Sequence, residues 1–196
     1  MIKFATGAAV AALAFAVPAA AQAQALSPAT VVVVDMERIS AECTACKTAA
    51  QQLQAQAVAI EQRAQQLRTP LETEAQTIQT AAQNNSVPEA QIQQQVQALQ
   101  AKQTQAQQEL AGRQQTFARN RAFVSQQIQE RVYPIIRTLM QQKGASLAIP
   151  TEATLAIAPT LDITSEVLAQ LNTQLPTVNV NAPAAPAQPQ AQPPGR

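Results

Sequence analysis

Two cysteines in C-x-x-C spacing offer the clearest reactive chemistry in this chain of 196 residues. Cys43 and Cys46 stand immediately before a long run of helix-forming residues. A thiol at the start of a helix has a lowered pKa, and two thiols at this spacing can form or exchange a disulfide. Three interpretations stay open: a local structural disulfide, two unreactive thiols, or a redox or metal function. Two Cys alone do not complete a zinc site.

The other residue types restrict the chemistry further. The chain has no His, which removes the side chain that most often serves as general base or metal ligand. It has four Gly, and none of them belongs to a phosphate-binding loop. We therefore expect no enzymatic activity and no cofactor. A thiol enzyme that uses the two cysteines is the minor alternative.

The charge is balanced overall but unevenly distributed. The chain has 13 Lys and Arg against 12 Asp and Glu, so no nucleic-acid partner is expected. The helical segment from Arg113 to Lys143 is basic, and Glu130 is its only counter-charge. This segment is either a solvated helix face or a surface that attracts acidic partners at long range. The candidate residues for the second role are Arg113, Arg119, Arg121, Arg131 and Arg137.

Residues 1–25 have the pattern of an export signal. Met1-Ile2-Lys3 supplies a positive start, and an apolar stretch follows to Val17. This stretch is shorter than the roughly 20 residues that a membrane-spanning helix needs. We expect cleavage near Ala21 to Ala25 and a periplasmic location, where disulfides can persist.

Residues 47–143 predict a long antiparallel helical hairpin with its tip near 84–88. The apolar residues of the first helix alternate spacings of three and four, as in a coiled-coil seam. They are Leu53, Ala57, Ile60, Ala64, Leu67 and Leu71. Asn84 and Asn85 end this helix, because Asn tolerates the left-handed backbone conformation. An interior Pro costs about 3 kcal/mol, so we expect a kink or a brief break near Arg68 to Pro70.

The segments that flank the hairpin predict a small body. Residues 26–46 contain a β-branched run that predicts a strand, followed by a short helix. Residues 144–172 contain two short apolar segments, 145–149 and 153–158, that predict a pair of strands, and then a closing helix. Residues 173–196 are rich in Pro, Ala and Gln and predict a disordered tail. So few strands do not form a stable sheet alone, and several chains could pool them.

Four short motifs lie in a fixed order around the long hairpin. They are Val31-Val32-Val33-Val34-Asp35-Met36, Arg131-Val132-Tyr133-Pro134-Ile135-Ile136, Lys143-Gly144-Ala145-Ser146-Leu147-Ala148-Ile149 and Leu161-Asp162-Ile163-Thr164-Ser165-Glu166-Val167-Leu168. In this order they resemble the Skp/OmpH family of periplasmic chaperones. The resemblance covers roughly residues 31 to 171 and includes the long hairpin.

The resemblance implies a mainly α fold in which the hairpins project from a trimeric, β-barrel-like body. It implies a homotrimer whose hairpins enclose a cavity, where unfolded outer-membrane proteins are held without ATP. The inward faces of the hairpins would contact these clients. The residues implied for the trimer body are Val31, Val32, Val33, Val34, Leu147, Ile149, Leu155 and Ile157.

This chain departs from the family pattern in its charge. Members of the family have strongly basic hairpins, whereas Gln replaces much of that charge here. We therefore assign no lipid or membrane-surface contact. The C-x-x-C motif and the tail also lie outside the usual pattern. The alternative function is a coiled-coil structural or adaptor protein of the cell envelope.

Overall fold

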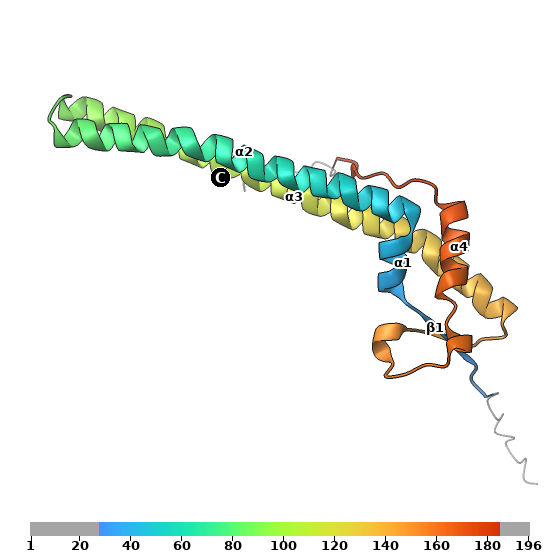
Figure 1. Ribbon diagram of the computed structural model, residues 1–196. Coiled ribbons are helices and arrows are strands. Elements are labelled where there is room, and N and C mark those ends of the chain that lie inside the picture. The colour runs from blue at the N-terminus through green and yellow to red at the C-terminus, as the bar shows by residue number, and fades with distance from the viewer. Residues whose placement is uncertain (1–27, 185–196) are drawn as a thin grey trace, which may run out of the picture.

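Two long helices, joined by a tight turn, extend from a small body in the computed structural model, which describes residues 28–184 (Figure 1). The expected signal peptide therefore lies outside the described residues. The elements are β1 (Val31–Val34), α1 (Met36–Glu42), α2 (Thr44–Gln83), α3 (Glu89–Gln142), β2 (Leu147–Pro150), two 3-10 helices (Thr151–Ala153 and Pro159–Leu161) and α4 (Thr164–Gln174).

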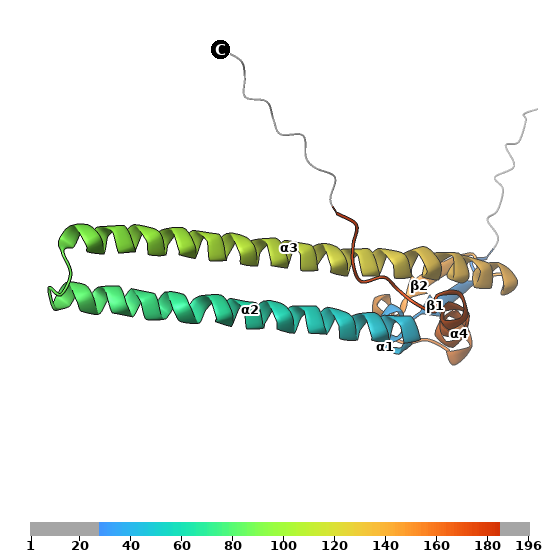
Figure 2. The same cartoon turned by 90° about the horizontal axis from the view of Figure 1, so that it is seen from above.

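Helices α2 and α3 lie side by side in both views of the ribbon (Figures 1 and 2). With 40 and 54 residues they are about 60 and 80 Å long, at about 1.5 Å per residue. Asn85 has a positive φ of 48° at the tip, and the amide of Ser86 donates to the carbonyl of Ala81. The hairpin and the position of its turn are therefore as the Asn-Asn sequence predicts. None of the helices within residues 28–184 combines the length and apolar character needed to cross a membrane.

The seam between α2 and α3 is thin. Ile78, Leu99, Ala106 and Val124 are buried along it, while most of the predicted seam residues of α2 are only half-buried. Each CH₂ group that Ala lacks relative to a larger side chain forgoes roughly 0.8 kcal/mol of burial. The two helices are consequently held by small, distributed contacts rather than by a dense core.

Of the two outcomes predicted near Pro70, a kink or a brief break, the break is wrong, because α2 runs through this residue without interruption. The hydroxyl of Thr69 donates backwards to the carbonyl of Gln65 (3.1 Å). It therefore behaves as a side chain inside a continuous helix. The turns on both sides of Pro70 pack against α3, so the loss of one backbone hydrogen bond does not divide the helix.

The hydrophobic core of the body lies around a two-stranded parallel sheet. Val31 of β1 is paired with Leu147 of β2, and Val34 with Pro150. Helices α1 and α4 and the last turns of α3 surround this sheet. The most deeply buried side chains come from all of these elements: Val33, Ile39, Cys43, Val132, Ile135, Ile163, Thr164, Val167 and Leu171.

The strand predicted over residues 153–158 is not present in this chain. The segment is irregular between the two 3-10 helices. Within residues 28–184, β1 pairs with β2 and forms one isolated bridge, from Val33 to Asp162. Leu155 is fully exposed, at 109% of its reference area. An apolar run forms a strand only when a neighbouring strand satisfies its backbone groups, and within residues 28–184 none is available.

The sequence predicts a disordered tail from residue 173, but the structure describes a packed chain up to residue 184. Helix α4 extends to Gln174, and residues 175–184, which we call the C-terminal strap, return along the base of the hairpin (Figure 2). Leu175 and Val180 are buried, and Val180 packs with Ala49 and Val124. Small apolar side chains at alternate positions give this Pro-containing segment a surface to bury. Residues 185–196 lie outside the described part of the chain.

Candidate functional site

Cys43 and Cys46 form a disulfide at the corner between α1 and α2. Both residues are buried in the body core. The amide of Cys43 ends α1 by donating to Ile39, and its sulfur accepts from the amide of Cys46 (3.3 Å) at the start of α2. The amide of Thr44 donates to the side chain of Asn172 on α4. This burial between three helices favours a structural disulfide over a reactive thiol pair.

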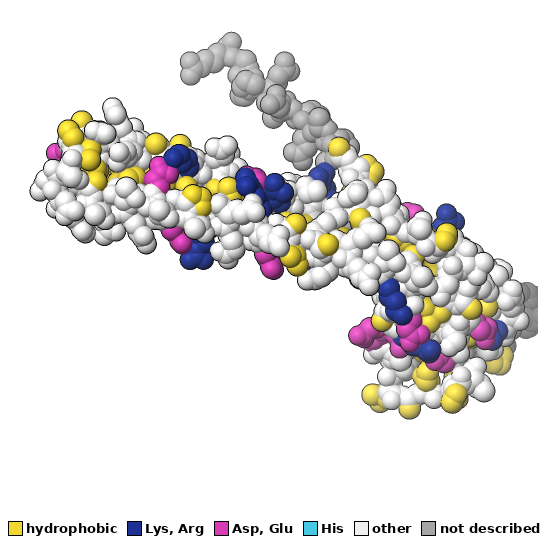
Figure 3. Space-filling view, turned by 45° about the horizontal axis from the view of Figure 1, so that its top comes forward, with side chains coloured by type: hydrophobic (Ala, Val, Ile, Leu, Met, Phe, Trp, Pro, Cys, Tyr) yellow, Lys and Arg dark blue, Asp and Glu magenta, His cyan; other side chains and the backbone are white. Residues whose placement is uncertain are grey.

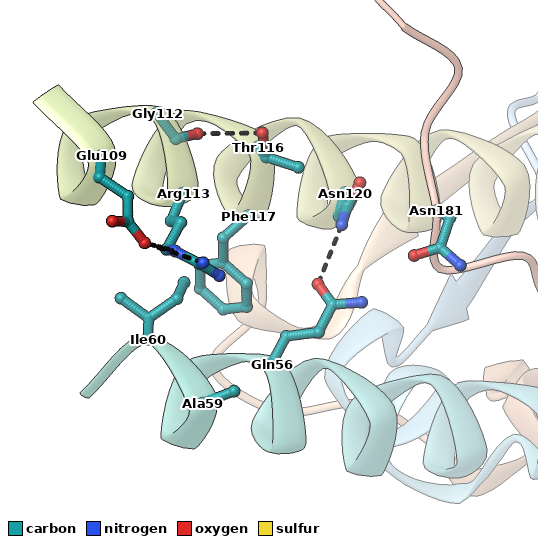
Figure 4. Close-up of a pocket in the computed structure, with 10 residues that line it drawn as sticks. All are labelled: Gln56, Ala59, Ile60, Glu109, Gly112, Arg113, Thr116, Phe117, Asn120 and Asn181. Atoms are coloured by element: carbon teal, nitrogen blue, oxygen red, sulfur yellow. Dashed lines mark hydrogen bonds and ion pairs between the residues drawn. The ribbon is translucent and has the colours of Figure 1, made fainter. Parts of the chain in front are cut away.

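The larger hollows in the described residues are open grooves between α2 and α3. One of these grooves has a volume of about 660 Å³, and Figure 4 shows its lining side chains. Ile60 and Phe117 give it an apolar floor, and the remaining lining is mostly polar or small. The lining residues are Gln56, Ala59, Ile60, Glu109, Gly112, Arg113, Thr116, Phe117, Asn120 and Asn181.

One end of this groove is a charge cluster that joins the two helices. Arg63 of α2 donates from Nε and Nη2 to the two carboxylate oxygens of Glu109 of α3, at 2.7 and 2.9 Å. Arg113, one turn further along α3, binds the same carboxylate at 3.0 Å. Hydrogen bonds from Arg63 and then Arg113 lower the pKa of Glu109 to about 2. The same pairing raises the pKa of Arg63. The carboxylate is thus ionised at neutral pH and fixed between two cations.

The other end of the groove is organised by a buried amide. Asn120 is 5% exposed, and its side-chain nitrogen donates to Gln56 of α2 at 2.9 Å (Figure 4). Its side-chain oxygen accepts from the backbone amide of Ala182 at 2.9 Å. Asn120 therefore connects both helices of the hairpin to the C-terminal strap.

A second amide, that of Gln127, also binds the strap. Its side-chain nitrogen donates to the carbonyl of Asn179 (2.8 Å), and its side-chain oxygen accepts from the amide of the same residue (3.1 Å). Between these two polar contacts the side chain of Val180 packs against Ala49 and Val124. We call Asn120, Gln127, Ala49, Leu53 and Val124 the strap site.

The five arginines suggested by the sequence do not form one continuous stripe. Arg113 is neutralised by Glu109, and Arg119 donates to the hydroxyl of Thr116 at 3.3 Å. Arg121 lies 6.0 Å from the centre of the Phe117 ring. The space-filling view shows Lys and Arg beside Asp and Glu along the hairpin (Figure 3).

Helical periodicity explains why these arginines separate. Arg113 and Arg131 are five whole turns apart and share a face, and Arg119 and Arg137 share another. Arg131 and Arg137 are exposed and form no ion pair with any residue of the described range 28–184. Contact between these residues and a client stays a prediction.

Sequence reasoning missed Arg63, Asn120 and Gln127. Asn120 occupies the seam between Phe117 and Val124, and a polar residue at a seam position was a usable signal. Gln127 carried no such signal, because it is one of many glutamines in the helix. Its role depends on a strap residue 52 positions away in the sequence.

The residues suggested for the oligomer body differ in their burial, and Val31, Ile149 and Ile157 are half-buried. Val32, Val33 and Val34 are buried within the chain's own body, whereas Leu147 and Leu155 are exposed. Tyr133 of α3 is 54% exposed. It also lines a hollow of about 280 Å³ in the body. The hollow is lined by Val34, Met36, Tyr133, Ile136, Ala148, Ile149 and Pro150. The body therefore presents an apolar surface that the single chain leaves uncovered.

The fold and its surfaces define a hairpin-on-body protein, whose described residues offer open grooves and an apolar body face. The model of the family "Outer membrane protein (OmpH-like)" matches residues 30–171. This match covers most of the chain, so the chain belongs to the OmpH-like family and the resemblance inferred from its motifs is confirmed.

The fold is also that of a solved structure from Caulobacter crescentus, a candidate outer membrane chaperone (OmpH-like). The two chains superpose with a TM-score of 0.69 at 20% sequence identity. The alignment covers 84% of this chain and 96% of the other, and at this identity it supports the fold alone. No curated protein matches the chain.

Proposed function

We propose that the chain is an ATP-independent periplasmic holdase, which binds unfolded outer-membrane proteins between the hairpins of a homotrimer. The observation that carries the proposal is the OmpH-like family match across the strands, the hairpin and α4. The family is one of chaperones without enzymatic activity. It also supports a periplasmic location, in agreement with the export signal expected from residues 1–25.

The apolar face of the body supports self-association. The sheet has only two strands within residues 28–184 and is covered by the chain's own helices, so strands from other copies would extend it at its edge. Leu155 is fully exposed, and Leu147 of β2 is 48% exposed. Exposed apolar patches of this kind mark interaction sites in soluble proteins. Three copies that pooled their strands would cover these side chains and anchor three hairpins at one end.

The surface of the hairpin suits a holdase. Its exposed residues are mainly Gln and Ala with scattered larger apolar side chains, and its grooves are open to solvent. Such a wall makes many weak, non-directional contacts, which keep a client soluble without selecting one conformation. The thin seam between α2 and α3 lets the hairpins bend, so that the space between them adapts to clients of different size.

The test is suppression of aggregation. A β-barrel outer-membrane protein, unfolded in urea, is diluted into buffer with this chain at three copies per client, and light scattering is recorded with and without ATP. We expect scattering to fall to a small fraction of the chaperone-free value, with no effect of ATP. Unchanged scattering at this ratio would refute the proposal. A helical globular protein, unfolded and diluted in the same way, tests for preference among clients.

The family match gives no support to the alternative of a structural or adaptor protein. An adaptor would bind one folded partner sharply and would be indifferent to unfolded chains. The same scattering assay therefore separates the two functions.

A further inference from the structure

We propose that the strap site is a binding site for an extended polypeptide segment with small apolar side chains at alternate positions. The C-terminal strap is its resident occupant and competes with segments of the same kind from clients. The identity of these clients rests on the proposed function. The recognition itself rests on the contacts between the strap and the hairpin.

Gln127 recognises backbone rather than side chain. Its carboxamide donates to the carbonyl and accepts from the amide of one residue, Asn179, at 2.8 and 3.1 Å. A neighbouring β-strand makes the same pair of hydrogen bonds to a residue opposite it. Every amino acid except Pro offers this donor and acceptor, so Gln127 accepts any extended segment whatever its sequence.

The spacing of the two amides matches an extended chain. Asn120 and Gln127 are seven residues apart, which places them on one face of α3 about 10.5 Å apart along its axis. Their backbone partners, Asn179 and Ala182, are three residues apart, which is about 10 Å in an extended strand. A helical segment with the same three residues would span only about 4.5 Å. The site therefore selects extended segments.

The side chains of the strap alternate between the hairpin and solvent. Val178, Val180 and Ala182 are buried or half-buried, whereas Asn179 and Asn181 are exposed. Val180 is 7% exposed and occupies the slot between the two amides. Alternate residues of an extended chain point to opposite sides. The hairpin surface therefore accommodates small apolar side chains at every second position of the segment.

This pattern is that of a transmembrane β-strand. Strands of outer-membrane barrels alternate apolar, lipid-facing residues with polar ones. A site that holds backbone and accepts apolar side chains at every second position therefore matches an unfolded barrel protein. Because the strap is tethered to α4, it has an effective concentration in the mM range, and only a locally concentrated client displaces it.

The experiment uses the full-length chain and a fluorescent synthetic peptide with the sequence of residues 176–184. Val180→Asp places a charge in the apolar slot and expels the strap. We expect this variant to bind the peptide at least about tenfold more tightly than the wild type, because intramolecular competition is removed. Fluorescence anisotropy gives the two dissociation constants. Equal binding, or binding by neither protein, overturns the proposal.

Two further variants separate the strap site from non-specific effects. Thr177→Asp introduces the same charge at an exposed position of the strap and should bind the peptide as weakly as the wild type. Adding Gln127→Ala to Val180→Asp should abolish the gain, whereas adding Gln115→Ala, on an exposed position of α3, should retain it. A gain that survives Gln127→Ala overturns the proposal.

Hydrogen exchange in the wild type gives a readout that does not depend on how the variants fold. The amides of Asn179 and Ala182 donate to side chains and should exchange slowly. Saturating unlabelled peptide should accelerate both, and unchanged exchange with peptide bound overturns the proposal. If strap competition fails while the scattering assay still shows suppression, the holdase function stands and only the strap site is rejected. If suppression fails while peptide competition holds, the strap site stands and the holdase function is rejected.

Discussion

Glu109 lies at the middle of the hairpin, where Arg63 and Arg113 both bind its carboxylate. The sequence shows two helices of Gln and Ala with a few scattered charges. The structure gathers three of these charges at one point of contact between α2 and α3. Partly exposed charge pairs are individually weak, but one carboxylate shared by two guanidinium groups has better geometry than an isolated pair.

Glu109→Gln should lower the thermal stability of the chain at pH 7. The pKa of Glu109 in the folded chain is about 2, below its ordinary value of 4.5. The ionised carboxylate therefore stabilises the fold above about pH 4.5, and this contribution is lost as the pH falls towards about 2. Melting curves by circular dichroism should show a difference in Tm between variant and wild type at pH 7 that narrows below pH 4.5.

Glu61→Gln is the matched control, since Glu61 is an exposed residue of α2 that forms no ion pair within residues 28–184. Its effect on Tm should be small at every pH. A Glu109→Gln difference that stays constant from pH 7 to pH 3 would contradict the assigned role of the two arginines.

At the scale of elements, α2 retains a proline in its interior. Pro70 interrupts one backbone hydrogen bond, yet the helix continues because its neighbouring turns pack on α3. In a hairpin with a thin seam, such a residue is a local weak point. It lies in the distal half of the helix, so this weak point is far from the body.

Pro70→Ala should stabilise α2, by up to about 3 kcal/mol on the helix-propensity scale. Hydrogen exchange of the surrounding turns should slow, and the urea midpoint of unfolding should rise. Thr69→Ala, at the adjacent exposed position, should change stability by only a few tenths of a kcal/mol. If hairpin bending serves client binding, the stiffer Pro70→Ala variant should suppress aggregation less well. Equal stability of the Pro70→Ala variant and the wild type would show that the proline imposes no strain on the helix.

The corner between α1 and α2 is fixed by the disulfide of Cys43 and Cys46. Because the loop it closes is short, the chain-entropy relation gives it only ~2 kcal/mol. Reduction of the wild type should therefore lower Tm by a few degrees without unfolding the hairpin. The double variant Cys43→Ala with Cys46→Ala should show no response to reductant. A response in the double variant would mean that the reductant acts elsewhere.

At the scale of the whole molecule, the exposed apolar side chains of the body are the surface through which we propose that the trimer forms. Leu155→Asp should prevent the proposed trimer from forming, because it would place a charge where apolar side chains meet. Light scattering after size exclusion should give the mass of three chains for the wild type and a smaller mass for the variant. Circular dichroism should show that the helices persist in both.

Val58→Asp is the matched control, since Val58 is 39% exposed on α2 and lies outside the body. It should leave the mass unchanged. A stable wild-type monomer would remove the basis for a cavity between hairpins, and the grooves of a single hairpin would then be the only client surface to consider.

Much of the fold could be read from local patterns. The three-four spacing of apolar residues predicted α2 and α3, and Asn84-Asn85 predicted the tip, because both signals act within a few residues. The predictions that failed depended on partners distant in the sequence. The apolar segment 153–158 lacked a neighbouring strand, and the brief break that was one expectation near Pro70 is absent because α2 packs against α3.

The sequence by itself determined the hairpin, the valine strand, the absence of histidine chemistry and the motifs of the OmpH-like family. These depend on residue type and on spacing along the chain. Only the tertiary structure decided that Arg63 and Arg113 share Glu109, and that the strap lies on Asn120 and Gln127. Gln127 binds the strap because the fold brings it within hydrogen-bonding distance of the backbone of Asn179, which is 52 residues away in the sequence. No local sequence pattern encodes that proximity.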